Sequence, residues 1–481
     1  MGCALRPQVP ADLAMGGSDR RAPHELLAGR DDTAARRRAA ADGGRVTSRP
    51  RPDSPGAEAW AGLDAATRVR AGGQTRDIGL HQPRRTLATL WPVSVAGVAE
   101  IVRRGLPVWP LSTGRNWGLG SRIPPADGDT VVDLSLLARI RALDTENGIA
   151  VVEPGVTQAQ LARAIAGTGW MVNLTGSCAY TSIVGNTAAA GDGVIRPRRG
   201  DVAGTETVTP TGAVEVTGVL AGGGHGPAWP RHGIVTAIAV RLTPVPEHLR
   251  IVHAHAAGPS AAVVAALGRC VAEASPGAMP RLYSGGVIVP ILGTRESVRE
   301  RAAAAAGILR AARGLSGVRV VSAASAPAQD GLHLVGMLLR GQPTCEMVRE
   351  SFGLPCGRVD RSGRGWLLVL PLLSPAVETV AGAARSWRQA ARRAGIPVAA
   401  EVIMVSPEVA HAVLQIRFDA GQADRAHNLK DTLAETLARN EMPLYRTGID
   451  DAARSWARLR AQVPGFGLCP GIEVVASSRF R

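Results

Sequence analysis

The sequence lacks any stretch of about 18 consecutive apolar residues, the length that a membrane-spanning helix needs. Its first residues also lack a basic segment followed by a continuous apolar one, which is the pattern of a secretory signal. Hydrophobic residues nevertheless make up 45% of the 481 residues, a share typical of a globular chain. We therefore expect a cytoplasmic location and no association with a membrane.

Lysine and aromatic residues are scarce. Lys430 is the only lysine among 55 lysine and arginine residues, and aromatic residues make up 3% of the chain. The net charge of +15 would attract a nucleic acid. However, the basic stretches contain no interleaved aromatic residues and match no RRM, zinc-finger or helix-turn-helix pattern. Because a coding bias explains the arginines equally well, we expect no nucleic-acid partner.

The six cysteines form no C-x-x-C pair and have no histidines at metal-ligand spacing. This scatter argues against a zinc site and against a redox dithiol. We expect no metal site, and reduced, mostly buried thiols. The cysteines are Cys3, Cys178, Cys270, Cys345, Cys356 and Cys469.

A chain of this length is too long for one ordinary core, so two domains are expected. Residues 1–80 are rich in Arg, Ala, Gly and Pro and show no clear apolar periodicity. We expect a disordered or loosely attached leader there, with one helix considered for residues 58–71.

Residues 81–246 form the first expected domain. An apolar strand, a helix from Val95 to Arg104 and a second strand precede a glycine-rich loop. The helix has a start signal at Ser94 and a stop signal at Gly105. Short strands and one amphipathic helix follow, at residues 130–135, 149–155, 157–169, 212–218 and 234–245.

Residues 247–425 form the second expected domain, in which apolar strands alternate with helices rich in Ala and Arg. This order predicts an antiparallel sheet with flanking helices. Residues 426–481 are expected to form a C-terminal segment that returns to the first domain. The predicted fold class is α+β.

The segment from Ser112 to Gly120, STGRNWGLG, directly follows an apolar strand. Its glycines allow backbone N–H groups to turn toward one point and to approach a phosphate closely, which makes an anion-binding nest. It is not a Rossmann fingerprint, because no G-x-G-x-x-G opens a helix, and no Gly-Lys-Ser/Thr of a Walker loop follows. Taken alone, this pattern is also typical of an ordinary tight turn.

Three further segments accompany this loop in order. Residues 152–157 (VEPGVT) end a strand, residues 182–187 (SIVGNT) are read as a second glycine turn, and residues 232–236 (HGIVT) open a late strand. Together the four segments resemble the FAD-binding domain of the superfamily of vanillyl-alcohol oxidase and p-cresol methylhydroxylase. The resemblance covers about residues 88–245 and extends more weakly to about residue 450. It implies a two-part FAD-binding domain of the p-cresol methylhydroxylase type, with a cap domain over the flavin ring.

The same resemblance implies which residues bind FAD. The first loop would bind the pyrophosphate through backbone donors, and the other three segments would line the flavin. The residues implied at the cofactor are Ser112, Thr113, Gly114, Arg115, Asn116, Trp117, Pro154, Gly155, Ser177, Ser182, Gly185, Asn186, Ile234 and Val235.

Tyr445 and Arg446 resemble the Tyr-Arg pair with which phenol-oxidising members of the superfamily bind the phenolate oxygen of the substrate. A guanidinium and a phenol hydroxyl both stabilise that anion. The alternative is a half-buried tyrosine beside an arginine in a surface ion pair. His411 falls where these enzymes have a His-His pair near the flavin. It is either catalytic with Tyr445 and Arg446 or a structural histidine between Ala410 and Ala412.

Three positions depart from the superfamily pattern. Leu119 stands where the phenol oxidases have a third phenolate-binding tyrosine, and Ser177 stands where an acidic residue lies near the flavin N5. Trp366 stands at the position of the histidine that attaches flavin covalently. Because tryptophan cannot form that bond, we expect non-covalent FAD.

We therefore expect an FAD-dependent oxidoreductase, an oxidase or a dehydrogenase, that transfers hydride from a small phenolic or aromatic substrate to flavin N5, in a secondary-metabolic role. The expected acceptor is O2 or an electron carrier. The oligomeric state stays open, with a homodimer as the candidate. Two alternatives are a 2-hydroxyacid dehydrogenase of the same fold and a flavin- or drug-sequestering protein with little turnover.

Overall fold

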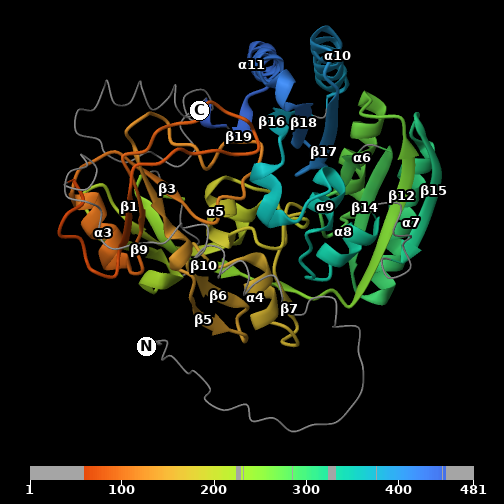
Figure 1. Ribbon diagram of the computed structural model, residues 1–481. Coiled ribbons are helices and arrows are strands. Elements are labelled where there is room, and N and C mark those ends of the chain that lie inside the picture. Colours follow the sequence, from red (N-terminus) through yellow and green to blue (C-terminus); the bar gives the residue numbers. More distant parts are fainter. Residues whose placement is uncertain are drawn as a thin grey trace. The chain divides into compact units, whose positions relative to one another are not determined.

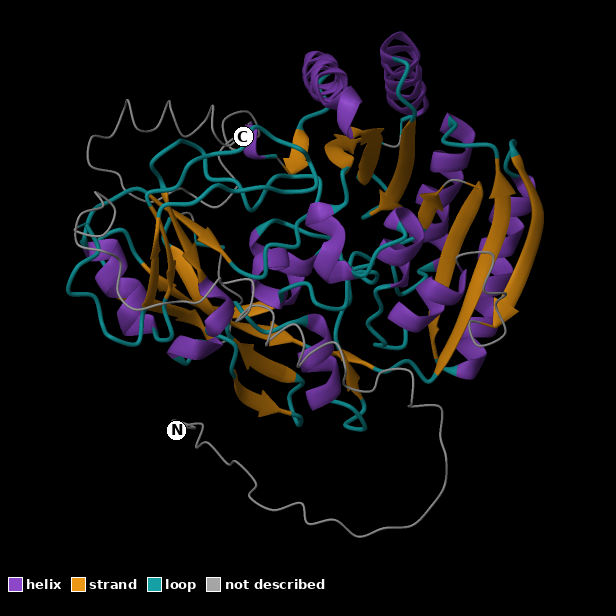
Figure 2. Ribbon diagram, in the orientation of Figure 1, coloured by secondary structure: helices purple, strands orange, loops and turns teal. Residues whose placement is uncertain are grey.

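The computed structural model describes residues 59–223, 229–230, 232–283, 285–322, 332–374, 376–446 and 448–450. These residues form helices and several separate sheets (Figure 1), joined by long loops (Figure 2). The α+β class predicted from the sequence is confirmed. The predicted leader before residue 59 and the chain after residue 450, with Cys3 and Cys469, lie outside the described residues.

The first sheet has four strands in the order β1-β2-β4-β3. β1 runs antiparallel to β2, whereas β2 and β3 both run parallel to β4, as a β-α-β connection requires. The crossover helix α3 begins after Ser94, whose side chain accepts a hydrogen bond from Gly97 N at 3.1 Å. The elements are β1 (Arg68–Ala71), β2 (Ala88–Trp91), α3 (Val95–Arg103), β3 (Val108–Leu111) and β4 (Thr130–Asp133).

Residues 59–80 are part of the first domain, so for them the expected leader is wrong. Trp60 is 3% exposed and belongs to the apolar cluster that contains Leu90 and Val98. Residues 68–71, for which a helix was considered, form the edge strand β1. Pairing with β2 and the burial of Trp60 outweigh the helix propensity of this alanine-containing segment.

The second sheet has five antiparallel strands in the order β5-β6-β10-β8-β9. Two short helices follow β6, and the first begins with a capping box of Thr157 and Gln160. A two-stranded pair, β7 and β11, lies outside this sheet. The elements are β5 (Ile140–Asp144), β6 (Ile149–Val152), α4 (Gln158–Ala164), β7 (Trp170–Met171), α5 (Ile183–Ala188), β8 (Val202–Val208), β9 (Val214–Gly218), β10 (Ile234–Arg241) and β11 (Thr243–Pro244).

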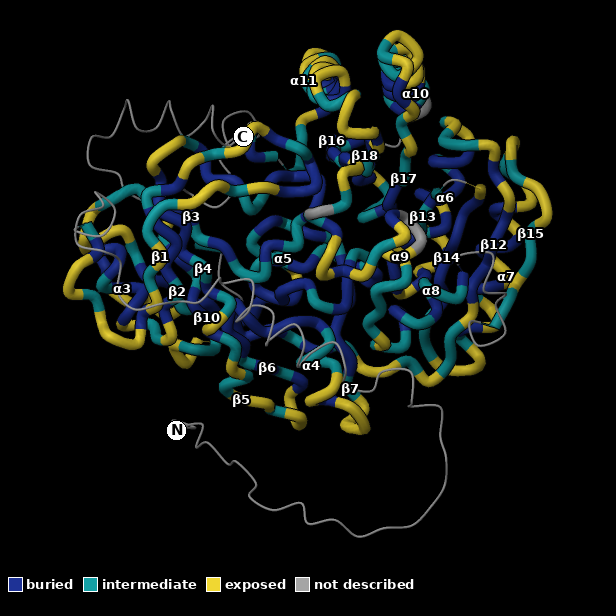
Figure 3. The backbone as a smooth tube through the Cα atoms, viewed as in Figure 1, coloured by how far each residue is buried: buried dark blue, intermediate teal, exposed yellow. Residues whose placement is uncertain are grey.

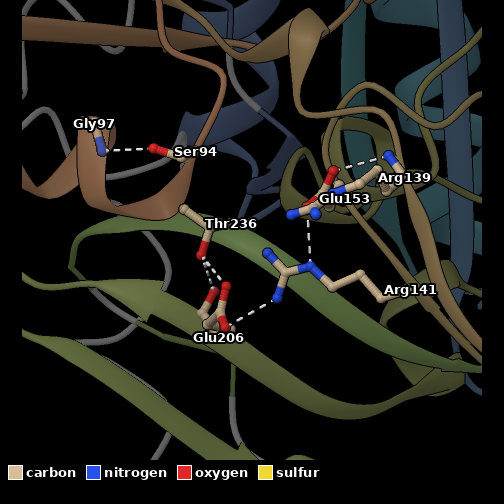
Figure 4. Close-up of polar contacts among 7 residues, drawn as sticks. All are labelled: Ser94, Gly97, Arg139, Arg141, Glu153, Glu206 and Thr236. Atoms are coloured by element: carbon tan, nitrogen blue, oxygen red, sulfur yellow. Dashed lines mark hydrogen bonds and ion pairs between the residues drawn. The ribbon is translucent and has the colours of Figure 1, made fainter. Parts of the chain in front are cut away.

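A buried carboxylate fixes the end of β6 (Figure 4). Glu153 accepts hydrogen bonds from Arg139 N at 2.8 Å and from Arg141 Nε at 2.9 Å. Arg141 also donates to Glu206 at 3.0 Å, and Glu206 accepts the hydroxyl of Thr236 at 2.7 Å. Burial acts to raise the pKa of Glu153, but hydrogen bonds from the two arginines outweigh it and lower this pKa. The network therefore anchors the turn that follows β6.

The third sheet is antiparallel and has eight strands in the order β15-β12-β14-β13-β17-β18-β16-β19. It forms the predicted cap domain. Its strands are β12 (His248–Ala256), β13 (Arg281–Tyr283), β14 (Gly285–Gly293), β15 (Leu315–Ser322), β16 (Arg364–Leu373), β17 (Val398–Met404), β18 (Ala410–Asp419) and β19 (Leu444–Arg446).

Four long helices cover one face of this sheet. Their apolar residues share one core cluster with alternate strand residues, among them Val252 and Ala254 of β12. Ile251, which precedes Val252 and so points to the opposite face, packs instead with Leu332 of α8. Figure 3 shows the resulting buried inner sides and exposed outer sides of α10 and α11. The helices are α6 (Ala261–Ala274), α7 (Arg295–Ala311), α10 (Val377–Ala394) and α11 (Ala423–Arg439), with the shorter α8 (Leu332–Leu338), α9 (Glu346–Phe352) and the 3-10 helix η6 (Cys356–Arg361).

The cap extends beyond residue 425, so the expected boundary there is wrong. Helix α11 spans that position and packs through Leu429 and Leu433 into the cap core. β19 then adds the last strand to the cap sheet through β16. After β19 the chain contacts the first domain again, where Ile449 N donates to Leu119 O at 2.9 Å.

Among the described residues, no helix has both the length and the apolar character needed to cross a membrane.

Candidate active site

One cavity is lined by the four segments that the sequence singled out. Its lining comes from the loop after β3, Pro154 after β6, the segment 181–189 around α5, and residues 233–235 at the start of β10. It contains about 1040 Å³ of empty space, part of it open to solvent. Cofactor and small-molecule sites have volumes of this order.

The loop after β3 turns sharply at Gly114, which has a φ of +64° and so a backbone conformation that favours glycine. Thr113 Oγ1 accepts a hydrogen bond from Ser182 N at 3.2 Å. Arg115 donates to Tyr180 O at 2.9 Å and stacks over the Tyr180 ring. These contacts join the loop to the segment before α5.

Residues 182–187 were read as a glycine turn, but they form the start of a short helix. Ser182 caps α5, because its Oγ accepts a hydrogen bond from Gly185 N at 2.8 Å and donates one to Pro154 O at 2.6 Å. A Cβ on Gly185 would lie 2.0 Å from Ser112 Oγ. The missing side chain therefore allows α5 to approach the loop closely.

Eleven of the fourteen residues implied at the cofactor line this cavity. They are Ser112, Thr113, Gly114, Arg115, Asn116, Pro154, Ser182, Gly185, Asn186, Ile234 and Val235.

The other three implied residues are not part of the lining. Trp117 is buried in an apolar cluster with Ile78. Gly155 packs against backbone, since a Cβ there would lie 2.3 Å from Ser135 O. The Ser177 hydroxyl is hydrogen-bonded within its own loop, at 3.1 Å to Thr181 Oγ1.

The structure brings together the three residues predicted to be catalytic at the edge of the cap sheet. The rings of His411 and Tyr445 stack with centroids 3.8 Å apart. His411 Nδ1 donates to Asp192 Oδ2 at 2.8 Å. Arg446, next in the chain, donates to Asn116 Oδ1. Asn116 therefore belongs both to the cavity lining and to this polar group.

Charge and burial set the protonation of this polar group. Burial raises the pKa of the Tyr445 phenol well above its usual range, and the negative charge of Asp192 adds to the rise. Tyr445 therefore stays protonated at neutral pH and can donate a hydrogen bond. Burial lowers the pKa of Arg446, but a guanidinium keeps its charge in a protein. Burial also lowers the pKa of the Arg199 guanidinium, and the positive charge of the nearby Arg446 lowers it further.

Four buried polar atoms of this region have no hydrogen-bond partner among the described residues. They are Asn116 Nδ2, Asn186 Oδ1, Asp192 Oδ1 and Arg446 Nε. A buried polar atom without a partner costs about 1–3 kcal/mol. Two of them belong to Asn116 and Asn186, which line the cavity, where a polar ligand would complete their hydrogen bonding. The site therefore fits a cofactor and a substrate with hydrogen-bonding atoms.

Asp192 and the ion pair of Arg281 with Glu401 were not expected from the sequence. Arg281 donates to Glu401 at 3.1 Å and to Gly193 O at 2.8 Å, which ties the cap to the loop that contains Asp192. Asp192 stands between two glycines in GDG, and a lone acidic residue in a glycine turn was the available signal. Its partner His411 is 219 positions away, so no local spacing relates the two.

The positions that depart from the superfamily pattern lie away from the cavity lining. Leu119 is 2% exposed and contacts the chain near Ile449. Trp366 packs against Phe352 with ring centroids 5.0 Å apart, and its backbone N–H donates to Ile78 O. The hydroxyl of Ser177 makes only the local contacts described above.

Comparison with known proteins assigns the first domain. The family described as "FAD binding domain" matches residues 86–218. The crystal structure of p-cresol methylhydroxylase with substrate bound superposes with a TM-score of 0.69 at 20% identity, over 81% of this chain and 89% of that one. Residues 86–218 thus match an FAD-binding domain, and the fold is similar to that of p-cresol methylhydroxylase. The predicted resemblance to this superfamily and the predicted cofactor FAD are thus confirmed.

Two characterised relatives match this chain in part. 1'-Carboxy-chondrochloren decarboxylase of Chondromyces crocatus is 35% identical over 191 residues, which is 35% of this chain and 35% of the relative. The flavoprotein subunit of 4-cresol dehydrogenase (hydroxylating) of Pseudomonas putida is 36% identical over 116 residues, 24% of this chain and 22% of the relative. The matches thus span about a third or less of the length of these relatives.

Gly185 provides a test of the cavity as the FAD site. We expect Gly185→Val to weaken FAD binding, because the new side chain would push Ser112 and its loop out of position. Overpacking of this kind costs about 1–3 kcal/mol, which corresponds to about 5- to 150-fold in Kd. Isothermal titration with FAD measures the change. Gly307→Val is the matched control, because Gly307 is exposed on α7 with no atom within 4 Å of its Cβ position. Equal affinity in the two variants would contradict the assignment.

Proposed function

We propose that this protein is an FAD-dependent oxidoreductase that oxidises a small phenolic or aromatic substrate. The observation that carries the proposal is a set of four unpartnered buried polar atoms, two on residues that line the cavity and two on Asp192 and Arg446 beside it. Three of them, on Asn116, Asp192 and Arg446, belong to the polar group that also contains the predicted residues His411 and Tyr445.

The lining residues would hold the cofactor. The loop from Ser112 to Asn116 would bind the pyrophosphate through backbone N–H groups, and no metal ion is needed for that. Pro154, Asn186 and the backbone of Ile234 and Val235 would line the flavin. Bound FAD would supply the hydride acceptor at its N5 atom and would pass electrons to O2 or to an electron carrier.

The polar group would bind and activate the substrate. With Nδ1 held by Asp192, a neutral His411 has Nε2 as its proton acceptor and can take a proton from a substrate hydroxyl. Arg446 would stabilise the anionic oxygen, and its side chain is fixed by Asn116. The protonated phenol of Tyr445 would donate to the same oxygen.

The relatives support an aromatic substrate. One is a 4-cresol dehydrogenase, and a solved structure of similar fold is that of p-cresol methylhydroxylase. We further propose that FAD is bound non-covalently, that the protein acts in the cytoplasm in secondary metabolism, and that its domains divide into residues 59–246 and 247–446.

A second candidate is a substrate with a carboxylate, such as a 2-hydroxy acid. Arg446 and Arg199 place two guanidinium groups close enough to affect each other, and such a pair favours an anion between them. The relative 1'-carboxy-chondrochloren decarboxylase has a substrate named as a carboxy compound, which also supports a carboxylate substrate. Tyr445→Phe separates the two candidates, because a carboxylate held by guanidinium groups needs no phenolic donor.

The test is anaerobic mixing of the FAD-loaded protein with para-alkylphenols in one series and 2-hydroxy acids in another. We expect the oxidised flavin band to bleach with a phenol, and Tyr445→Phe to slow that bleaching. Bleaching only by hydroxy acids would favour the second candidate. A band that shifts without bleaching in both series would instead indicate a sequestering protein.

Acid precipitation tests the mode of attachment. We expect the flavin to remain in the supernatant, because Trp366 packs against Phe352 and offers no atom for a flavin bond. The absorbance of supernatant and pellet measures the partition. A yellow pellet would contradict non-covalent binding.

A further inference from the structure

Three cysteines that are scattered in the sequence meet in the fold. Cys178 lies in the loop before α5, Cys345 precedes α9, and Cys356 begins η6. Cys178 Sγ lies 3.5 Å from Cys345 Sγ and 3.1 Å from Cys356 Sγ, and all three sulfur atoms lie within 4.8 Å of one another. The cluster thus joins the FAD-binding domain to the cap.

The surroundings of this three-cysteine cluster are apolar with one positive charge nearby. Cys178 and Cys356 are buried, whereas Cys345 is partly exposed. The same apolar cluster contains Trp117 and Phe352. The Arg115 guanidinium acts electrostatically on both Cys345 and Cys356. Three thiolates with a divalent ion carry one negative charge, and Arg115 would neutralise it.

We propose that Cys178, Cys345 and Cys356 bind one thiophilic metal ion, Zn²⁺ or Cu⁺, between the two domains. Thiolate ligands select these ions. With metal–sulfur bonds of about 2.3 Å, ligand sulfur atoms lie about 3.8–4.0 Å apart. To reach that spacing, the 3.5 Å separation of Cys178 and Cys345 would grow by about 0.3–0.5 Å, and the 3.1 Å separation of Cys178 and Cys356 by about 0.7–0.9 Å. Binding would release the thiol protons to solvent.

The two ions would complete their coordination differently. Zn²⁺ prefers four ligands, and in sites with three protein ligands a water takes the fourth position. The partly exposed side of Cys345 leaves room for such a water. Cu⁺ is satisfied by three thiolates alone. Both ions use the same three sulfur atoms, so the choice between them is left to the experiment.

The second group of metal-type side chains in the described residues is a weaker candidate. His81, His427 and Asp450 lie close together, but Lys430 is ion-paired with Asp450. An ammonium group in that position competes with a metal ion for the carboxylate.

A bound ion would affect the cavity. The loop that contains Cys178 continues directly into Thr181 and Ser182, which line the cavity. The ion would hold this loop against the start of η6 in the cap. Metal binding is therefore expected to raise the thermal stability of the protein, since an ion that binds only the folded state stabilises it.

The test uses the tag-free full-length protein, reduced, treated with a chelator and kept anaerobic. One portion is loaded with Zn²⁺ and another with Cu⁺, and metal per chain is measured after gel filtration. Co²⁺ serves as a spectroscopic probe, because its ligand-field bands lie in the red, where oxidised flavin does not absorb. We expect one ion per chain in at least one portion, intense thiolate–cobalt bands, and a higher Tm than in the metal-free protein.

Cys345→Ser and Cys356→Ser should each lose stoichiometric binding and the thiolate–cobalt bands. Cys270→Ala is the control, because Cys270 is buried in α6 and lies outside the cluster. It should bind like the unaltered protein. Circular dichroism confirms that the variants fold. Failure of the unaltered protein to retain either ion, or equal retention by the Cys356→Ser variant, overturns the proposal.

Discussion

Replacing Arg446 by methionine is expected to lower kcat/KM by about 100- to 1,000-fold, the usual effect of removing one donor to a developing oxyanion. The Arg446 guanidinium is held by Asn116 and has one buried N–H group, on Nε, without a partner. Methionine keeps an unbranched apolar stem but is shorter than arginine and removes the guanidinium charge. The measurement is the rate of flavin reduction with the phenol that reduces the unaltered protein fastest.

FAD content separates a substrate effect from a loss of cofactor. We expect Arg446→Met to retain FAD, because Arg446 does not line the cavity and touches it only through Asn116. Arg446→Lys should recover part of the rate by restoring a positive charge, although lysine cannot make the same fork of hydrogen bonds. Arg364→Met is the matched control, since Arg364 is exposed on β16, the strand that pairs with β19. Equal rates in the two methionine variants would contradict the role of Arg446.

Removing the charge of Asp192 is expected to lower kcat by about 100- to 10,000-fold, the range of a lost general base. Asp192→Asn is close to isosteric, but its amide can donate to His411 Nδ1. It would then favour the wrong tautomer of the ring, so that Nε2 carries the proton and cannot accept another. His411→Gln should have an effect of similar size.

A double variant distinguishes positioning from general damage. If Asp192 acts through His411, the protein with both Asp192→Asn and His411→Gln should be no slower than His411→Gln alone. Glu408→Gln is the control, because Glu408 is exposed in the turn just before His411. A double variant much slower than His411→Gln would show that Asp192 does not act through His411.

The FAD-binding loop could be found from the sequence because its signals are local. The strand before Ser112, the glycines after it and the turn at Pro154 depend on neighbouring residues. The structure places Ser112, Pro154 and Gly185 on one cavity, as the resemblance implied. Two implied residues close to these signals, Trp117 and Gly155, instead face protein. A loop motif indicates where the backbone turns but not which side each residue faces.

The remaining features depend on contacts between distant parts of the chain. Asp192 can be recognised as a site residue only from its hydrogen bond to His411 on β18. In the same way, Cys178 becomes a candidate ligand only because it lies close to two cysteines of the cap. The cap boundary at residue 425 was misplaced because nothing local shows that α11 packs on β16 and β18. The early strand β1 was missed for the same reason, since only its pairing with β2 fixes it.

The most direct test of the central claim is the FAD content of purified protein after incubation with excess FAD and gel filtration, followed by a crystal structure of the coloured fraction. We predict one FAD per chain, with the diphosphate against the backbone amides between Ser112 and Asn116. A colourless protein, or a flavin bound away from the cavity shared by this loop and α5, would contradict the account.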